Sequence, residues 1–404
     1  MKKRITITLL TIFSLSTIIL AIDINNSASG ILFIDKIKWY FGLPTQAFTI
    51  PEGTTIIEPY AFFDSNITKI DIPNTVTAIG EAAFKDCKKL TTVIIPNGVV
   101  SIGEKAFCGC TSVVKVVIPE SVVSIGKNAF YGCNGTLEIN CNIPHNSFED
   151  NKFSKVLIKN SVGTIGDYAF SNCNKMNFIE ISDSVISIGE RAFNGCYNLK
   201  RTVIGKNVIS YGQDSFKECT GELFINGNIP SSTNLGCGVF HGSKFMKVVI
   251  GNSVKTIGDR AFCGCVSLKY LILGDDITSI GYKSFSSCSM ETVLIPDNVK
   301  NIGISAFDSC KFLKELTIGA KVSFIRNFAF CDCSALASIY CKAATPPAIY
   351  GNRECATFPF NDNMRIYVPT NSYDSYTSYY FYLDQSISQT NWSLYKPYIT
   401  AHNF

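Results

Sequence analysis

An Ala-Phe dipeptide recurs along this chain of 404 residues at a nearly constant step. Most successive copies are 22 or 23 residues apart, and two longer gaps, 130–170 and 216–262, each contain a degenerate copy, near Phe148 and Phe240. A fixed period of this length predicts a solenoid, because each repeat can bury its apolar face only against its neighbours. The repeated phenylalanines are Phe62, Phe84, Phe107, Phe130, Phe170, Phe193, Phe262, Phe307 and Phe330, with Ser-Phe variants at Phe216 and Phe285.

The repeat at residues 90–110 indicates how one coil folds. Residues 92–95 alternate between inward and outward positions and are rich in β-branched side chains, which is typical of a short strand. Pro96 ends this strand, since proline cannot donate to a ladder. The Ala-Phe segment is too short for an α-helix and is expected to form an irregular or 3₁₀ turn. Stacked coils of this kind predict a mostly β solenoid of the α/β type, with a parallel sheet on one face and short turns on the other.

A glycine turns the chain between the strand and the Ala-Phe segment of each coil. Its recurrence indicates a backbone conformation that is costly for other residues. The turn glycines are Gly80, Gly103, Gly126, Gly166, Gly189, Gly212, Gly236, Gly258, Gly281 and Gly303.

The seventeen cysteines mostly follow the phase of the repeat. Ten lie three residues after the repeated phenylalanine, and Cys108, Cys263 and Cys331 lie one residue after it. We expect a ladder of reduced, buried thiols, because side chains stacked in parallel have poor disulfide geometry; scattered disulfides or a metal are the alternatives. Cys141, Cys237, Cys341 and Cys355 are out of phase and are the better candidates for a bridge. The ladder residues are Cys87, Cys110, Cys133, Cys173, Cys196, Cys219, Cys265, Cys288, Cys310 and Cys333.

The consensus Leu-x-x-Val-x-Ile-Pro-x-x-Val-x-x-Ile-Gly-x-x-Ala-Phe-x-x-Cys resembles the BspA-like (treponemal-type) leucine-rich repeat family over residues 55–345. The resemblance implies a right-handed array of about 12–13 coils of 22–23 residues. The degenerate units, residues 136–158 and 222–250, are similar to variants found in that family. The resemblance also implies a secreted or surface-displayed protein that mediates adhesion.

The two ends of the chain have different compositions from the repeats. Lys2, Lys3 and Arg4 precede an apolar run at residues 5–21, which predicts an export signal cleaved after Ala21 or near Ala28, with an uncleaved anchor as the alternative. Residues 22–54 are expected to cap the first coil, and residues 346–404, rich in tyrosine, to cap the last. An alternative for this tail is an aromatic glycan-binding patch that includes Trp392. The sequence contains no second apolar run long enough to span a bilayer, so we expect no membrane insertion after cleavage.

The sequence contains few residues that could form a catalytic site. The three histidines, His145, His241 and His402, belong to no catalytic motif that we recognise. The Cys-x-Cys pairs have no further ligands nearby in the sequence, so we expect no metal, no cofactor and no enzymatic activity. The net charge of +4 is too small to favour nucleic-acid binding.

The outward positions of the strands are the candidate partner-binding face. One column is largely basic and aromatic, and its neighbour is largely aliphatic; a contiguous exposed apolar strip is unusual for a surface without a partner. The alternative is that β-branched residues favour strands wherever they point. The residues of the basic column are Lys69, Thr92, Lys115, Lys155, Phe178, Arg201, Lys247, Tyr270, Thr292, Glu315 and Ser338. Those of the aliphatic column are Asp71, Ile94, Val117, Leu157, Glu180, Val203, Val249, Ile272, Leu294, Thr317 and Tyr340.

These features predict a non-enzymatic protein that binds other proteins through its strand face. Host matrix or plasma proteins, or the surfaces of other cells, are the expected partners. A self-associating surface coat and a glycan-binding accessory protein are the alternatives.

Overall fold

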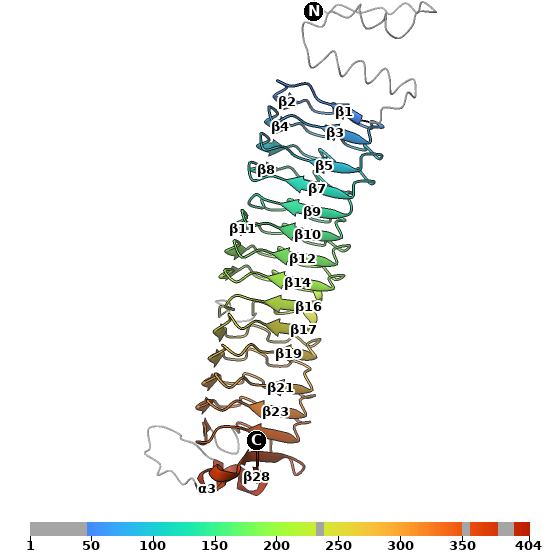
Figure 1. Ribbon diagram of the computed structural model, residues 1–404. Helices are drawn as coiled ribbons and strands as arrows, with labels where there is room; N and C mark the ends of the chain where they lie inside the picture. The colour runs from blue at the N-terminus through green and yellow to red at the C-terminus, as the bar shows by residue number, and fades with distance from the viewer. Residues whose placement is uncertain (1–46, 232–237, 350–355, 379–391) are drawn as a thin grey trace, which may run out of the picture.

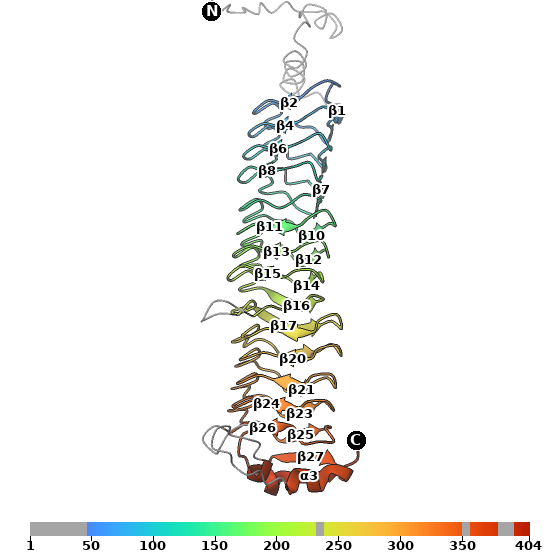
Figure 2. The ribbon, with the colours of Figure 1, turned by 90° about the vertical axis from the view of Figure 1, so that its left-hand side faces the viewer.

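A computed structural model describes residues 47–231, 238–349, 356–378 and 392–404. These residues form an elongated parallel β-solenoid of about 13 turns, which confirms the predicted fold (Figures 1 and 2). Gly236, Cys237, Cys355, the predicted signal and most of the predicted N-terminal cap lie outside the described residues. The division of the chain into signal, caps and repeats stays a prediction.

The main ladder contributes one strand from each coil, and every hydrogen-bonded pair in it is parallel (Figure 1). Three hydrogen-bonded sheets follow one another along the solenoid: β1–β3, then β5 to β19, then β21 to β28. In chain order the strands are β1 (Ala47–Thr49), β3 (Lys69–Asp71), β5 (Thr92–Ile94), β7 (Lys115–Ile118), β9 (Thr136–Ile139), β10 (Lys155–Ile158), β12 (Phe178–Ile181), β14 (Arg201–Ile204), β16 (Thr220–Ile225), β17 (Lys244–Ile250), β19 (Tyr270–Ile272), β21 (Thr292–Leu294), β23 (Glu315–Ile318), β25 (Ser338–Cys341), β27 (Arg365–Pro369) and β28 (Ile399–His402).

A second parallel ladder of two-residue strands runs along another side of the solenoid (Figure 2). The sequence does not reveal these strands, because two residues are too few to show an alternating pattern. Bridges between Ile143 and Ile165, and between Ile229 and Ile257, join each degenerate coil to the coil that follows it, and the ladder consists of three separate sheets. Its strands are β2 (Ile56–Ile57), β4 (Ala78–Ile79), β6 (Ser101–Ile102), β8 (Ser124–Ile125), β11 (Thr164–Ile165), β13 (Ser187–Ile188), β15 (Ser210–Tyr211), β18 (Thr256–Ile257), β20 (Ser279–Ile280), β22 (Asn301–Ile302), β24 (Phe324–Ile325) and β26 (Ala348–Ile349).

The turn glycines are required for a different reason from the one predicted. None of the nine described ones has a positive φ, so their backbone conformation is open to other residues. The constraint is the preceding coil: a Cβ on Gly103 would lie only 2.6 Å from the backbone nitrogen of Glu81. Glycine is therefore needed for close approach between coils.

The Ala-Phe segment forms an irregular turn with one residue of positive φ on each side of the phenylalanine. Around Phe107, Lys105 and Gly109 have φ of 54° and 78°. The amides of Lys105, Phe107 and Gly109 donate to carbonyls of the next coil at 3.0, 2.7 and 2.7 Å, and the amides between them donate within the coil. Positive φ thus recurs two residues before and two after the repeated phenylalanine, and it gives this arc its own hydrogen bonds between coils.

The core of the solenoid is a stack of phenyl rings. Consecutive rings from Phe62 to Phe358 have centroids 4.8–5.9 Å apart. Phe148 and Phe240 keep the stack continuous through the degenerate coils. The core phenylalanines named from the sequence are all buried: Phe84, Phe107, Phe130, Phe170, Phe193, Phe262, Phe307 and Phe330.

The ten phased cysteines lie beside this stack and are buried and free. Each thiol donates to the carbonyl oxygen of the phenylalanine in the preceding coil, over 3.0–3.4 Å. The same carbonyl also accepts a hydrogen bond from an amide of its own coil, as the Phe84 carbonyl does from the Cys87 amide. The thiols therefore act as hydrogen-bond donors inside the core as well as small apolar fillers.

The C-terminal elements cover the last coil (Figure 2). They are η2 (Thr370–Ser372), α3 (Tyr373–Thr377), η3 (Trp392–Tyr398) and β28. The Trp392 Nε1–H donates to the Pro347 carbonyl at 2.7 Å, and the Tyr376 hydroxyl donates to the Ala343 carbonyl at 2.6 Å. Trp392 is fully buried. It therefore offers no face on which a sugar could stack, and the predicted glycan-binding role of Trp392 is wrong.

The N-terminal described strand begins earlier than the predicted repeat array. β1 pairs with β3 and lies within the segment assigned to the cap. Among the described residues, no helix has the length and apolarity needed to cross a bilayer.

Candidate binding face

The two outward columns of the main ladder lie in register along the nine strands β5 to β19. Direct pairing places Lys115 beside Thr136, Lys155 beside Phe178, and Phe178 beside Arg201. The basic column over these strands is Thr92, Lys115, Thr136, Lys155, Phe178, Arg201, Glu222, Lys247 and Tyr270. The aliphatic column is Ile94, Val117, Glu138, Leu157, Glu180, Val203, Phe224, Val249 and Ile272.

The degenerate coils supply four members of these columns that are absent from the columns predicted from the sequence. They are Thr136, Glu138, Glu222 and Phe224. The segments Thr-Leu-Glu-Ile and Glu-Leu-Phe-Ile alternate like the regular strands, and that signal would have revealed them. Because Glu138 and Glu180 interrupt the aliphatic column, it is not the contiguous apolar strip that was predicted.

Exposure along the aliphatic column is greatest toward its ends. Ile94 is 60% exposed, Ile272 51% and, in the next sheet, Leu294 58%. Val117, Leu157 and Val249 are half-buried between neighbouring side chains. The apolar surface available to a partner is therefore concentrated near β5 and near β19–β21.

A groove of about 510 Å³ lies on this face where two of the sheets meet. β17 is seven residues long, and its pairing with β16 shifts register between Gly221 and Glu222. This irregularity leaves Met246 exposed beside Tyr270 and Ile272, an apolar contribution that the repeat phase did not predict. The groove is lined by Gly221, Glu222, Met246, Lys247, Tyr270, Leu271, Ile272 and Thr292.

The cations of the basic column fall into two groups. Lys69, Lys115 and Lys247 pair with Asp71, Glu138 and Glu222 at 2.9, 3.1 and 3.4 Å. In contrast, the Lys155 ammonium lies 5.2 Å from the centre of the Phe178 ring, and the Arg201 guanidinium 4.5 Å from that of Phe224. Both are cation–π contacts.

A second, polar groove of about 740 Å³ begins on this face and continues over the loops that follow β10, β12 and β14. Asp183 stabilises one wall of this groove. The Asp183 carboxylate accepts a hydrogen bond from the Lys206 amide at 2.9 Å and pairs with the Lys206 ammonium at 3.4 Å. Lys155, Leu157, Glu180 and Val203 belong both to this groove and to the strand face.

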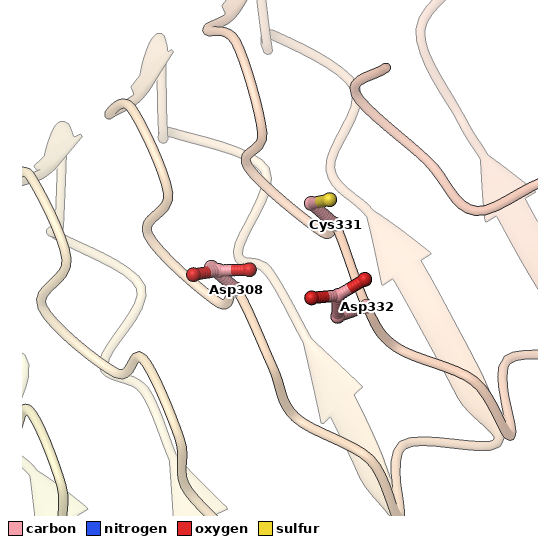
Figure 3. A group of neighbouring side chains, drawn as sticks. All are labelled: Asp308, Cys331 and Asp332. Carbon is pink, nitrogen blue, oxygen red and sulfur yellow. The ribbon is translucent and has the colours of Figure 1, made fainter. Parts of the chain in front are cut away.

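One group of potential metal ligands occurs in the described part of the chain. Ligand atoms of Asp308, Cys331 and Asp332 lie within 4.8 Å of one another on neighbouring turns (Figure 3). Desolvation raises the pKa of the Asp308 carboxyl and of the Cys331 thiol, so the thiol stays protonated at neutral pH. Cys333 points away from this group and donates to the Phe307 carbonyl in the core. Cys331 and Cys333 therefore point to different sides of the chain, and three donors are fewer than a structural zinc site uses.

The described histidines contact neighbouring coils. The ring Nδ1 of His145 lies 2.9 Å from the Asp167 amide, and that of His241 lies 2.9 Å from the Cys263 carbonyl. His402 packs edge-on against Tyr340 and Tyr367. These contacts place the three histidine rings between neighbouring coils.

Two out-of-phase cysteines are also described and are free. Burial raises the pKa of both Cys141 and Cys341 to about 11. The Cys341 sulfur lies 3.2 Å from the Tyr376 hydroxyl. Because that hydroxyl uses its proton on the Ala343 carbonyl, the thiol is the donor in this contact.

Comparison with known proteins identifies the repeat. The family described as BspA type leucine rich repeat region matches in 6 copies, over residues 38–142, 141–240 and 233–346. A search of curated proteins found no match. Among solved structures, a leucine-rich repeat protein from Bacteroides ovatus is 23% identical, with 80% of this chain and 92% of that chain covered and a TM-score of 0.35. A leucine rich cell surface protein from Faecalibacterium prausnitzii is 22% identical, with 79% and 92% covered and a TM-score of 0.31. The pneumococcal vaccine antigen PcpA is 18% identical, with 89% and 78% covered and a TM-score of 0.34.

Proposed function

Because the chain belongs to the BspA-type leucine-rich repeat family, we propose that it is a non-enzymatic secreted or cell-surface protein that binds other proteins through its strand face. Adhesion to host matrix or plasma proteins, or to other cells, is the form of binding we propose. The export signal expected at residues 1–21 supports this location. Leucine-rich repeat arrays act through extended surfaces, and binding along many coils adds weak contacts into useful affinity.

The observation that carries the proposal is the exposed apolar surface around β17–β21. Tyr270 is 62% exposed, Met246 53% and Ile272 51%, and they gather at one groove. Interface cores are enriched in aromatic residues and methionine, and a clustered exposed patch is costly for a surface without a partner.

The test is capture of partners from host matrix and serum by the purified protein, with identification by mass spectrometry. We expect Ile272→Asp to abolish capture of the major partners without lowering the melting temperature, because the side chain faces solvent. The matched control is Val123→Asp, which places the same charge on a 73% exposed residue away from the strand face. Equal loss of capture in both variants, or in neither, would contradict binding at this face.

Self-association as a surface coat remains the alternative to partner binding. Light scattering of the purified protein at rising concentration distinguishes the two, since a coat protein assembles and a monomeric adhesin does not. Concentration-dependent assembly that Ile272→Asp abolishes would assign the groove to a second copy of the chain.

A further inference from the structure

The first strands of the two degenerate units, β9 and β16, bracket a short stretch of the strand face. β10, β12 and β14 lie between these two strands (Figure 1). The outward glutamates of the bracketing strands, Glu138 and Glu222, pair with Lys115 and Lys247. These pairs neutralise the basic column on either side of the bracketed strands.

Lys155 and Arg201 are the two cations of the basic column inside the brackets. Both are exposed, and neither has a carboxylate within ion-pair distance in the described part of the chain. Their contacts with Phe178 and Phe224 hold the charges over the strand face without neutralising them. Within the sheet from β5 to β19, the column therefore presents unpaired positive charge only over this stretch, which we call the cationic window: Lys155, Phe178, Arg201 and Phe224.

Building on the proposed function, we infer that the cationic window binds an extended acidic segment of the protein partner, with two carboxylates three residues apart. Lys155 and Arg201 lie two rungs apart in the ladder, about 10 Å. In a polyproline II segment, residues three apart lie on the same side and about 9 Å apart. One such segment running along the solenoid axis places a carboxylate at each cation.

The surroundings of the window favour a peptide over a polyanionic glycan. Leu157 and Val203 flank the cations in the neighbouring column, and Glu180 lies between them. Half-buried aliphatic side chains suit the apolar residues of a peptide. A carboxylate at the centre of the site repels a chain that is anionic at every unit.

The test is selection of a random displayed peptide library on the full-length protein, followed by fluorescence anisotropy of the enriched peptides. We expect enrichment of peptides with two acidic residues three positions apart, and affinity that falls with added salt. K155E/R201E is expected to weaken the binding of these peptides fivefold or more, since two attractive charge pairs are replaced by repulsion.

The matched control is K69Q/K115Q, which removes two cations of the same column that are already paired and lie outside the window. We expect less than a twofold change in that variant. E138Q/E222Q releases Lys115 and Lys247 from their partners, and the same acidic peptides should bind it more tightly. All three variants change exposed or half-exposed side chains and should melt like the wild type.

Three outcomes would overturn the inference. Enriched peptides without acidic pairs, or peptides that bind K155E/R201E as well as the wild type, would show that the window is not the binding site. If Ile272→Asp still abolished partner capture, the proposed function would stand without the window. Retention on immobilised heparin that K155E/R201E abolishes, with no acidic peptide enriched, would assign the window to an anionic glycan. Peptide binding that no strand-face variant affects would contradict the window and the proposed function together.

Discussion

At the scale of single residues, the space between neighbouring coils decides which side chains are tolerated. The turn glycines show this, because their φ values are ordinary and only the backbone of the preceding coil excludes a Cβ. Gly163 is different: a Cβ there would meet nothing nearer than the Asn142 side-chain oxygen at 3.4 Å. Replacement by alanine should therefore lower the stability at Gly103 but not at Gly163, although neither glycine has a positive φ.

We predict that Gly103→Ala lowers the free energy of unfolding by about 1–3 kcal/mol, because the coils must separate to admit the methyl group. Gly163→Ala, the matched control, should be neutral or slightly stabilising, since it only restricts the unfolded chain. Urea unfolding followed by circular dichroism measures both. Equal effects at the two positions would show that backbone conformation, rather than approach between coils, sets the requirement.

At the scale of the repeated element, each coil contributes a phenyl ring to a continuous internal stack, and ten coils also contribute a thiol. Ser65, Asn151 and Ser243 take the place of the cysteine in three other coils. The thiol matters beyond its size, because it donates to the carbonyl of the preceding coil at every phased position. Burial raises the pKa of the Cys173, Cys196, Cys265 and Cys288 thiols, and for Cys265 it raises the pKa from 9.0 to about 12. The phenyl stack runs through every coil and so joins the coils into one cooperative unit.

The raised thiol pKa values predict slow labelling and alkaline instability. At pH 8 iodoacetamide should modify the half-buried Cys108, Cys263 and Cys331 before any ladder cysteine, because the thiolate is the reactive form. The buried Cys265 thiol contributes its full stabilisation below pH 9, where the thiol of the unfolded chain is also protonated. That stabilisation is lost as the pH rises from about 9 toward 12, since Cys265 ionises only in the unfolded chain over this pH range. Mass spectrometry of labelled peptides and urea unfolding at several pH values measure the two effects. Rapid labelling of Cys265 in the folded protein at pH 8 would contradict a buried ladder.

At the scale of the whole molecule, the solenoid presents a long face and must close its ends. Sixteen strands make the main ladder about 70 Å long. Phe358 extends the phenyl stack beyond the last coil, and Trp392, Tyr376 and Tyr395 pack around that end. An uncovered end would expose apolar side chains and strand edges, which promote association between molecules.

We predict that Trp392→Ala opens the C-terminal end. The loss of a buried tryptophan costs about 3–5 kcal/mol and leaves the Pro347 carbonyl without its donor. Limited proteolysis should begin at the C-terminal elements, and light scattering should rise with concentration. Phe404→Ala is the control, because Phe404 is 52% exposed and its loss should change neither measurement. A monomeric Trp392→Ala protein with the wild-type protease pattern would show that this end needs no such cover.

The sequence alone determined the repeat, the strand in each coil, and the inward phase of residues such as Phe193 and Cys196. It could do so because a side chain in a solenoid faces the core at the same place in every repeat, so the 22–23-residue period records burial directly. Only the tertiary structure decided what depends on one coil lying against the next. It placed Glu138 beside Lys115, exposed Met246 at a register shift, paired the two-residue strands and buried Trp392 in the end of the core. Those contacts join residues that are separated by a whole coil or more. Their register is set by packing and hydrogen bonding between coils, which a local sequence pattern does not contain.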